Sequence, residues 1–150
     1  MIDPERKDFI FRSVNTPHQF SYENGVTVTH VEPGRAEGVL EVGPNSINPH
    51  GNVHGGALAT LADTVGGWAV YFATGKPCVT VNYAFSFLRP ALGTNKKLCC
   101  RAVPEKLGGK LCVYRQTITD DNGVEVANGN FTFYLTDYSG EKKSVPPADA

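Results

Sequence analysis

Two adjacent glycines, Gly55 and Gly56, stand directly after His54 at the expected start of a long helix. A glycine inside a helix costs about 1 kcal/mol of stability relative to alanine. At a helix N-terminus, however, the backbone amides are free, and a glycine lets a ligand approach them closely. Because the helix dipole also favours negative charge there, the two amides are candidate donors to an oxyanion. Close packing of the helix start against a sheet is the alternative explanation.

An aspartate, Asp63, lies farther along the same expected helix, among apolar residues such as Leu61 and Val65. No basic residue stands three or four positions away to pair with it, and burying an unpaired carboxylate is costly. These surroundings favour a functional role for Asp63 over a purely structural one. A position on the solvent-facing side of the helix is the alternative.

Helical spacing separates Asp63 from the two glycines. Gly56 and Asp63 lie on nearly the same face of the helix, but roughly 10 Å apart along its axis. One helix cannot bring its own Asp63 to its own N-terminus, whereas two antiparallel helices related by a two-fold axis can. The spacing therefore predicts a homodimer with composite sites, in which Asp63 of one subunit faces the two glycines of the other.

The elements that must position these residues follow from hydrophobic periodicity. We expect helices over residues 4–12 and 53–73, and strands over residues 26–31, 36–42, 78–88, 97–104, 110–119 and 124–136. Gly75 and Pro77 end the long helix, and Asn122-Gly123 predicts a two-residue hairpin turn of type I′. This order predicts an α+β fold, with one long helix wrapped by a curved antiparallel sheet of about six strands. One helix cannot cover both faces of such a sheet, which again favours a homo-oligomer.

Length and composition restrict the class of protein. The 150 residues predict one domain over residues 1–136, with a helix and loop over about 1–24 and a polar tail over 137–150. A net charge of −1 gives no electrostatic reason to expect nucleic acid or an anionic membrane as partner. No apolar run reaches the roughly 20 residues that span a bilayer, and the charged N-terminus lacks the apolar stretch of a signal peptide.

The cysteines and histidines predict neither a disulfide framework nor a metal site. The four cysteines contain no C-x-x-C pair, which favours a reduced cytoplasmic protein with buried thiols over disulfides or zinc. His50 and His54 are four residues apart, as in some metal sites, but no glutamate follows His50 and this residue precedes the expected helix. We therefore expect no metal and no other cofactor.

The pattern N-x-x-G-x-x-H-G-G-x-x-x-x-x-x-D resembles that of the PaaI-type hotdog-fold acyl-CoA thioesterases. It is formed here by Asn48, Gly51, His54, Gly55, Gly56 and Asp63, and the segments Gly67-Trp-Ala69 and Phe87-Leu-Arg-Pro90 are also similar to that family. The resemblance covers about residues 20–136. It implies a hotdog fold, an acyl-CoA substrate, hydrolysis to free acid and coenzyme A, and a homodimer or a dimer of dimers.

The resemblance also implies roles for individual residues. Asp63 would be the general base that activates water, or the nucleophile itself. The Gly56 amide, and with it the Gly55 amide, would polarise the thioester carbonyl, while Asn48 positions water or that carbonyl and His54 supports the site by hydrogen bonding. Thr80 would supply a hydroxyl to the leaving group or to water; an ordinary β-branched strand residue is the alternative.

Substrate contacts outside the motif are expected from charge and hydrophobicity. Arg89 and Lys106 are candidate contacts for the phosphates of coenzyme A, although a solvated surface charge is the plainer explanation for each. The acyl pocket is expected to be lined partly by Leu61, Val65, Phe85 and Phe87.

Two other functions remain as alternatives. The first is an acyl-CoA-binding module of the same fold that does not turn over its ligand. The second is a hotdog enoyl-CoA hydratase, but Ser46 stands where the hydratase motif carries its catalytic aspartate.

Overall fold

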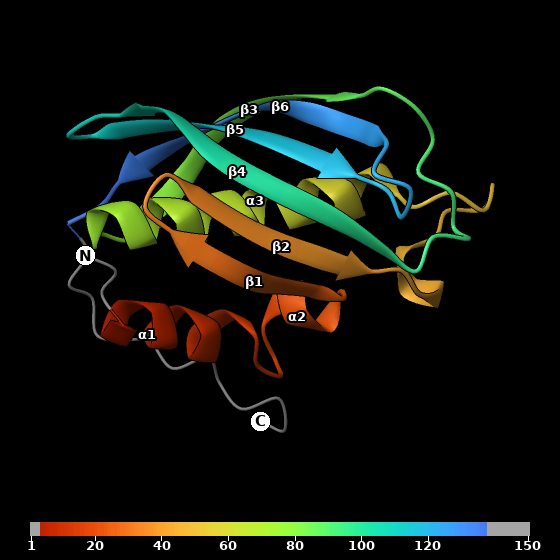
Figure 1. Cartoon of the computed structure of the whole chain (residues 1–150), viewed down its shortest axis with the longest axis horizontal. Helices are drawn as coiled ribbons and strands as arrows, with labels where there is room; N and C mark the ends of the chain where they lie inside the picture. Colours follow the sequence, from red (N-terminus) through yellow and green to blue (C-terminus); the bar gives the residue numbers. More distant parts are fainter. Residues whose placement is uncertain (1–3, 138–150) are drawn as a thin grey trace.

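A long helix, α3 (Gly55–Thr74), lies against one face of a six-stranded antiparallel sheet (Figure 1). The computed structural model describes residues 4–137. The strands are β1 (Val26–Glu32), β2 (Arg35–Glu41), β3 (Cys78–Phe87), β4 (Lys97–Leu107), β5 (Leu111–Thr119) and β6 (Glu125–Leu135). Their order in the sheet is β1-β2-β4-β5-β6-β3, so β3, which follows α3 directly in the chain, lies at the far edge beyond β6. The expected α+β arrangement is confirmed.

Three short elements accompany this core: α1 (Pro4–Val14), α2 (Phe20–Glu23) and the 3-10 turn η1 (Pro44–Ser46). The sequence predicted the first of these but neither of the other two, which are only one turn long. α1 and α2 lie beside β1, next to each other on the same side of the molecule (Figure 1). The polar tail expected over residues 137–150 lies outside the described residues, except for Asp137.

Helix α3 ends as predicted, whereas the last hairpin turn differs. Gly75 adopts the left-handed conformation (φ 71°) and its N–H donates to the Tyr71 carbonyl at 2.8 Å. The β5–β6 connection is longer than two residues, and only Gly123 in it has a positive φ, 75°. The Asp120 carboxylate accepts hydrogen bonds from the backbone N–H groups of Asn122 and Val124, both at 2.9 Å. The type I′ prediction is therefore wrong, because the Asp120 side chain stabilises a longer loop.

Two glycines let α3 approach the sheet closely. A Cβ added at Gly38 of β2 would lie 2.5 Å from a methyl carbon of Val65. A Cβ added at Gly66 would lie 2.0 Å from the Gln116 side chain on β5. The side of α3 that makes these contacts faces the core. Its buried residues are Leu58, Leu61, Ala62, Val65, Gly66, Ala69, Val70 and Phe72. The opposite side of α3 faces away from its own sheet.

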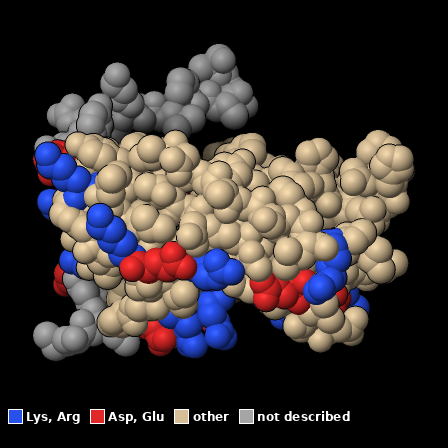
Figure 2. All heavy atoms as spheres, turned by 90° about the horizontal axis from the view of Figure 1, so that it is seen from above, with Lys and Arg blue, Asp and Glu red and all other residues tan. Residues whose placement is uncertain are grey.

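The two edges of the sheet are covered differently. At β1, the Asn15 side chain, just beyond α1, accepts a hydrogen bond from the Val28 N–H (2.8 Å) and donates one to the Val28 carbonyl (2.7 Å), as a neighbouring strand would. At β3, no strand of residues 4–137 pairs with the outer side. Almost the whole of β3 is exposed, including Val81 at 54% and Tyr83 at 52%. Figure 2 looks onto this end of the molecule and shows a broad area without charged side chains.

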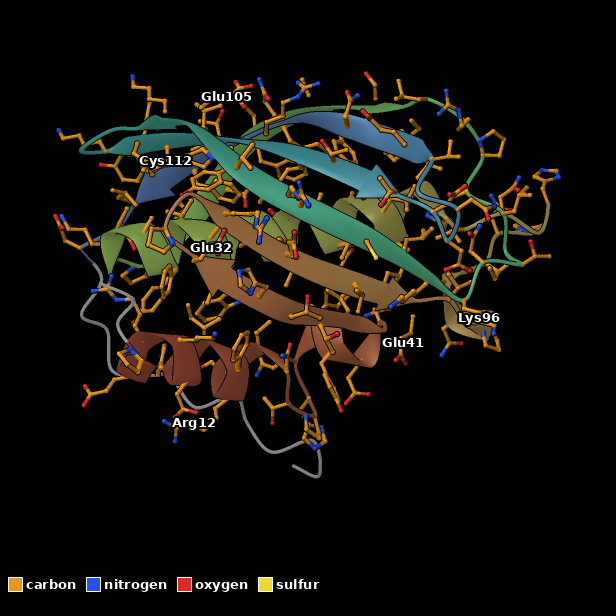
Figure 3. All side chains as sticks on the ribbon, viewed as in Figure 1. Arg12, Glu32, Glu41, Lys96, Glu105 and Cys112 are labelled. Atoms are coloured by element: carbon orange, nitrogen blue, oxygen red, sulfur yellow. The ribbon has the colours of Figure 1, made fainter. Side chains whose placement is uncertain are left out.

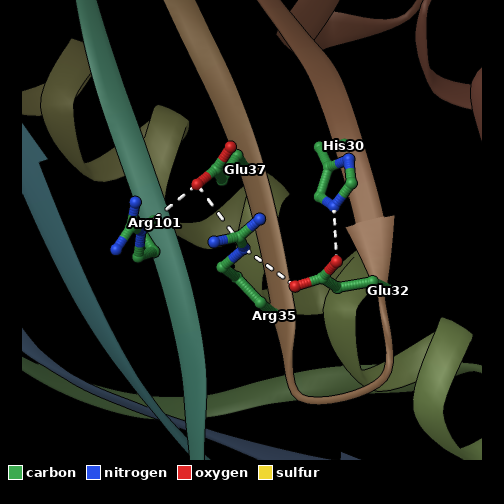
Figure 4. Close-up of polar contacts among 5 residues, drawn as sticks. All are labelled: His30, Glu32, Arg35, Glu37 and Arg101. Carbon is green, nitrogen blue, oxygen red and sulfur yellow. Dashed lines mark hydrogen bonds and ion pairs between the residues drawn. The ribbon is translucent and has the colours of Figure 1, made fainter.

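Charged side chains gather instead on the β1–β2–β4 side of the sheet. Figure 3 shows Glu32, Glu41 and Lys96 on this side. Figure 4 shows an ion-pair network that crosses the three strands. It runs from His30 through Glu32, Arg35 and Glu37 to Arg101, with N–O distances of 3.0, 3.1, 3.6 and 3.2 Å.

Candidate active site

The start of α3 is organised by the His54 side chain. His54 precedes the helix in an extended conformation (φ −61°, ψ 135°), and its ring Nδ1 accepts a hydrogen bond from the Gly56 N–H at 2.8 Å. The neutral ring therefore carries its proton on Nε2. Within residues 4–137, no group accepts a hydrogen bond from the Gly55 N–H. Of the two amides expected as oxyanion donors, Gly56 is thus already occupied and Gly55 is free.

Phe87, at the end of β3, lies over this helix start. A Cβ added at Gly55 would lie 3.6 Å from the Phe87 ring, and Phe85 meets the Phe87 ring edge-on at 5.6 Å between centroids. Both phenylalanines were expected as substrate contacts. The structure brings Phe87 together with Gly55, and Phe85 lies next to Phe87.

Asn48 stabilises the loop that leads into α3. Its side-chain oxygen accepts hydrogen bonds from the backbone N–H groups of His50 (3.0 Å) and Asn52 (3.1 Å). Gly51 in the same loop has a positive φ of 82°, which favours glycine. These contacts fix the approach to His54, and a role for Asn48 in positioning water or the carbonyl stays a prediction.

Asp63 lies on the side of α3 that its own sheet leaves open. The Thr80 hydroxyl on β3 donates a hydrogen bond to Asp63 Oδ1 at 2.5 Å. The two residues are 17 positions apart in sequence, and they meet because β3 returns alongside α3. Asp63 is half-buried and Thr80 is exposed, so the carboxylate has a polar partner and is also open to a ligand.

The thiol closest to this pair is not an alternative nucleophile. Cys78 donates a weak hydrogen bond to the Gly67 carbonyl, with an S–O distance of 3.6 Å. Burial is the main cause that raises the pKa of Cys78 to about 12, and the proximity of the Cys112 thiol and the Asp63 carboxylate adds to it. Because only the thiolate attacks carbonyl groups effectively, Cys78 is inert at neutral pH.

A pocket of about 910 Å³ opens beside Asp63 and Thr80. Its walls come from α1, α2, the second half of α3 and the start of β3, and its aromatic residues are Phe9, Phe20, Trp68, Tyr71 and Phe133. None of these side chains was assigned a role from the sequence. The segment Gly67-Trp-Ala69 was noted only as a family resemblance, and nothing local in the sequence could show that α1 packs against α3.

Two of the residues expected to line an acyl pocket do not do so. Leu61 and Val65 have no exposed surface and lie in the core. The reason is helical geometry. Leu61 and Val65 are each two positions from Asp63, and residues two positions apart on a helix point in nearly opposite directions, so neither can face the pocket that Asp63 faces. That prediction is wrong for both.

One chain holds the site residues in two separate groups. The first group is Gly55, Gly56, His54 and Phe87, and the second is Asp63 and Thr80. Along α3, Gly55 and Asp63 are separated by roughly 12 Å. Along β3, Thr80 and Phe87 are separated by roughly 23 Å.

The two expected phosphate contacts are also far apart. Arg89 donates to the Glu125 carbonyl at 2.5 Å, just beyond the end of β3. Lys106 lies opposite Val113 of β5 in the sheet register. Following the register across β5 and β6 leads to Asn82 of β3, so Lys106 and Asn82 lie at the same position along the strand direction. Asn82 and Arg89 are seven residues apart, or roughly 23 Å. Within one chain, Arg89 and Lys106 therefore cannot contact the same phosphate.

Three further observations concern the alternatives considered from the sequence. Ser46, in the position of the hydratase aspartate, is buried and exchanges hydrogen bonds with the Gly43 backbone at 2.9 and 3.0 Å. In residues 4–137, no three metal-ligating side chains come together. Over the same range, no helix has the length and hydrophobicity needed to cross a bilayer.

Comparisons with known proteins identify the family to which the chain is similar. The family model of the thioesterase superfamily matches residues 50–127. A Deinococcus radiodurans protein to which esterase activity is attributed is 32% identical over 101 residues, covering 66% of this chain and 67% of that protein.

Solved structures match over most of the chain. The Escherichia coli PaaI protein from the phenylacetic acid degradation operon superposes with a TM-score of 0.79 at 22% identity, covering 88% of this chain and 94% of that one. The Streptococcus mutans protein smu.793, solved with acetyl-CoA bound, has a TM-score of 0.69 at 27% identity, covering 74% of this chain and 88% of that one. The hotdog fold expected from the sequence is confirmed.

Proposed function

The chain belongs to the thioesterase superfamily, and from this membership and the site geometry we propose that it hydrolyses an acyl-CoA to a free carboxylic acid and coenzyme A. The observation that carries the proposal is the Asp63–Thr80 pair, a carboxylate with a polar partner at the mouth of a large pocket. Acetyl-CoA bound to the Streptococcus mutans relative supports coenzyme A as the carrier.

In the proposed reaction, Asp63 takes a proton from a water molecule as that water attacks the thioester carbon. Thr80 donates to Oδ1 and so fixes the orientation of the carboxylate, which leaves Oδ2 to face the water. The carbonyl oxygen becomes negatively charged and needs donors. The C–S bond then breaks, and Asp63 returns the proton it took from the water to the departing sulfur of coenzyme A. Direct attack by Asp63 through an anhydride is the variant of this mechanism that also fits the geometry.

We propose the Gly55 amide as the oxyanion donor, in place of the Gly56 amide favoured by the resemblance. The Gly56 N–H already donates to His54, whereas the Gly55 N–H is free and lies at the positive end of the α3 dipole. His54 then has a positioning role, because its hydrogen bond fixes the first turn of the helix. Arg89, two residues beyond Phe87, is the better placed of the two candidate phosphate contacts for a substrate bound at this helix start.

The complete site requires two subunits in this proposal. Asp63 and the Gly55 amide are too far apart in one chain, but two antiparallel α3 helices would bring each Asp63 opposite the partner's helix start. The midpoint between residues 55 and 63 is Ala59, whose small side chain allows two helices to approach closely. The exposed apolar strand β3 would be covered in the same interface. We therefore propose a homodimer with two composite sites, which can pair further into a tetramer.

The test is a thiol-release assay over acetyl-, hexanoyl-, palmitoyl- and benzoyl-CoA, with the wild type and Asp63→Asn. Loss of the general base should lower kcat at least about 10²-fold. The matched control is Asp8→Asn, which removes an exposed carboxylate paired with Arg12 on α1 and should leave kcat unchanged. Binding of acyl-CoA without turnover by the wild type would favour the non-catalytic module, and normal activity of Asp63→Asn would contradict the mechanism.

A further inference from the structure

Two neighbouring glycines of α3, Gly66 and Gly67, have opposite surroundings. A Cβ at Gly66 would lie 2.0 Å from Gln116 Nε2 and 2.8 Å from Phe133 Cζ, so packing requires glycine there. A Cβ at Gly67 would meet a single neighbour, Phe133 Cε1, at 3.8 Å, which is ordinary contact. Glycine in a helix interior costs about 1 kcal/mol relative to alanine. The fold explains Gly66 but gives no reason for Gly67.

Gly67 lines the pocket that holds Asp63. It follows Asp63 by four residues, so the two stand one above the other on the same face of α3. The missing side chain leaves open space directly next to the reacting carboxylate. One turn farther, at Tyr71, the helix face carries a large side chain again.

An aromatic cluster forms the wall beyond this open space. The ring of Phe9 on α1 lies 6.5 Å from that of Trp68 and 5.6 Å from that of Tyr71, and Trp68 and Tyr71 are 5.5 Å apart. Arg6 of α1 donates to the Phe72 carbonyl at 2.8 Å, which holds α1 against α3. The wall is therefore fixed by contacts of its own and offers apolar faces and edges to a ligand.

We propose that Gly67 is a specificity-determining residue that admits an acyl group with a ring or a branch next to the thioester carbon. This inference rests on the proposed function, because it seats the thioester carbon at Asp63. The bulky part of the acyl group occupies the space over Gly67 and packs on Trp68, Tyr71 and Phe9. A pocket of about 910 Å³ is within the range of roughly 300–1,000 Å³ usual for small-molecule sites.

The experiment compares the wild type with Gly67→Ala and Gly67→Leu, which fill the space in two steps. The measured quantity is the ratio of kcat/KM for benzoyl-CoA to that for acetyl-CoA. One misplaced methyl group in an apolar pocket changes selectivity about tenfold or more, so the ratio should fall about tenfold in Gly67→Ala and further in Gly67→Leu. The melting temperature of Gly67→Ala should be no lower than that of the wild type, because alanine is the better helix former.

The matched control is Gly109→Ala in the β4–β5 connection, outside the pocket. A Cβ at Gly109 meets nothing within 4 Å, so the same added methyl group should leave the ratio unchanged. Hydrolysis of both substrates with the wild-type ratio in Gly67→Ala and Gly67→Leu would overturn the assignment of Gly67 and leave the proposed function standing.

A binding measurement tests the role of Gly67 without requiring that the protein hydrolyses its ligand. Phenacyl-CoA and acetonyl-CoA are ketones that carry the same acyl groups and cannot be hydrolysed. Their dissociation constants are measured by calorimetry. Gly67→Leu should weaken the binding of phenacyl-CoA at least about tenfold more than the binding of acetonyl-CoA. This result in a protein that hydrolyses no acyl-CoA would contradict the proposed function but support the pocket. Equal weakening of both ketones would overturn the pocket assignment.

Discussion

The strands β1 and β3 form the two opposite edges of the sheet, and these edges differ in what covers them. The β1 edge is closed by the Asn15 side chain, and an ion-pair network crosses its surface (Figure 4). The β3 edge has exposed apolar side chains, and no strand of the described residues pairs with it. A long exposed apolar edge attracts another strand, and Thr80 of this edge holds Asp63. The comparison indicates that the side of the molecule that carries the proposed general base is also its proposed interface.

The largest expected effect comes from charging the open edge. The double substitution Val81→Lys and Tyr83→Lys places two like charges on β3, which repel their copies across a two-fold axis. The dimer should dissociate in light scattering, and kcat/KM should fall by more than about 10³-fold because both composite sites are lost.

The matched control for this prediction is Thr29→Lys, an exposed position on the closed edge strand β1. It should change neither the oligomeric state nor the activity. A dimer that persists with two lysines on β3, or one that dissociates with a single lysine on β1, would contradict the proposal that β3 and not β1 forms the interface.

A smaller effect is expected from deleting one backbone donor. Gly55→Pro removes the free N–H at the first position of α3, where proline is well tolerated. The preceding residue, His54, already has the extended conformation that proline requires (ψ 135°). Loss of an oxyanion donor should lower kcat by about 10²–10³-fold.

The control is Gly55→Ala, which keeps the N–H and adds a methyl group at ordinary contact distance from Phe87. It distinguishes the loss of the hydrogen-bond donor from the effect of a side chain at this position. Circular dichroism should show the same helix content in both variants. Equal kcat values in Gly55→Pro and Gly55→Ala would argue that this amide does not contact the reacting oxygen.

The smallest effect concerns the charged network of the closed edge. The hydrogen bond from His30, opposed by partial desolvation and assisted by Arg35, lowers the pKa of Glu32 from its usual value of 4.5. A carboxylate with a lowered pKa in the folded state adds stability above pH 4.5, and this contribution is lost as the pH falls through the lowered pKa. The melting temperature of the wild type should exceed that of Glu32→Gln at pH 7, and the difference should shrink below pH 4.5. A difference that grows in acid would contradict this sign.

The sequence predicts local features of the site better than long-range ones. The start and end of α3 follow from Gly55 and Gly75, because helix termini depend on a few neighbouring residues. The position of β3 beyond β6, and with it the contact of Thr80 with Asp63, depends on strand order, which periodicity does not contain. Leu61 and Val65 were assigned to the pocket because their hydrophobicity was read without the direction of each side chain. Phe9 was missed because only the packing of α1 on α3 brings it to the site.

The central claim is that Asp63 of one subunit acts on a substrate held at the helix start of the other. Its most direct test is co-expression of Asp63→Asn with Gly55→Pro in equal amounts, each nearly inactive alone. Half of the dimers should then contain one copy of each, and every such dimer has one intact composite site and one doubly defective site. The mixture should recover about a quarter of the wild-type kcat per subunit pair. Activity no higher than that of the two separate variants would contradict the account, because it would mean that each chain builds its site alone.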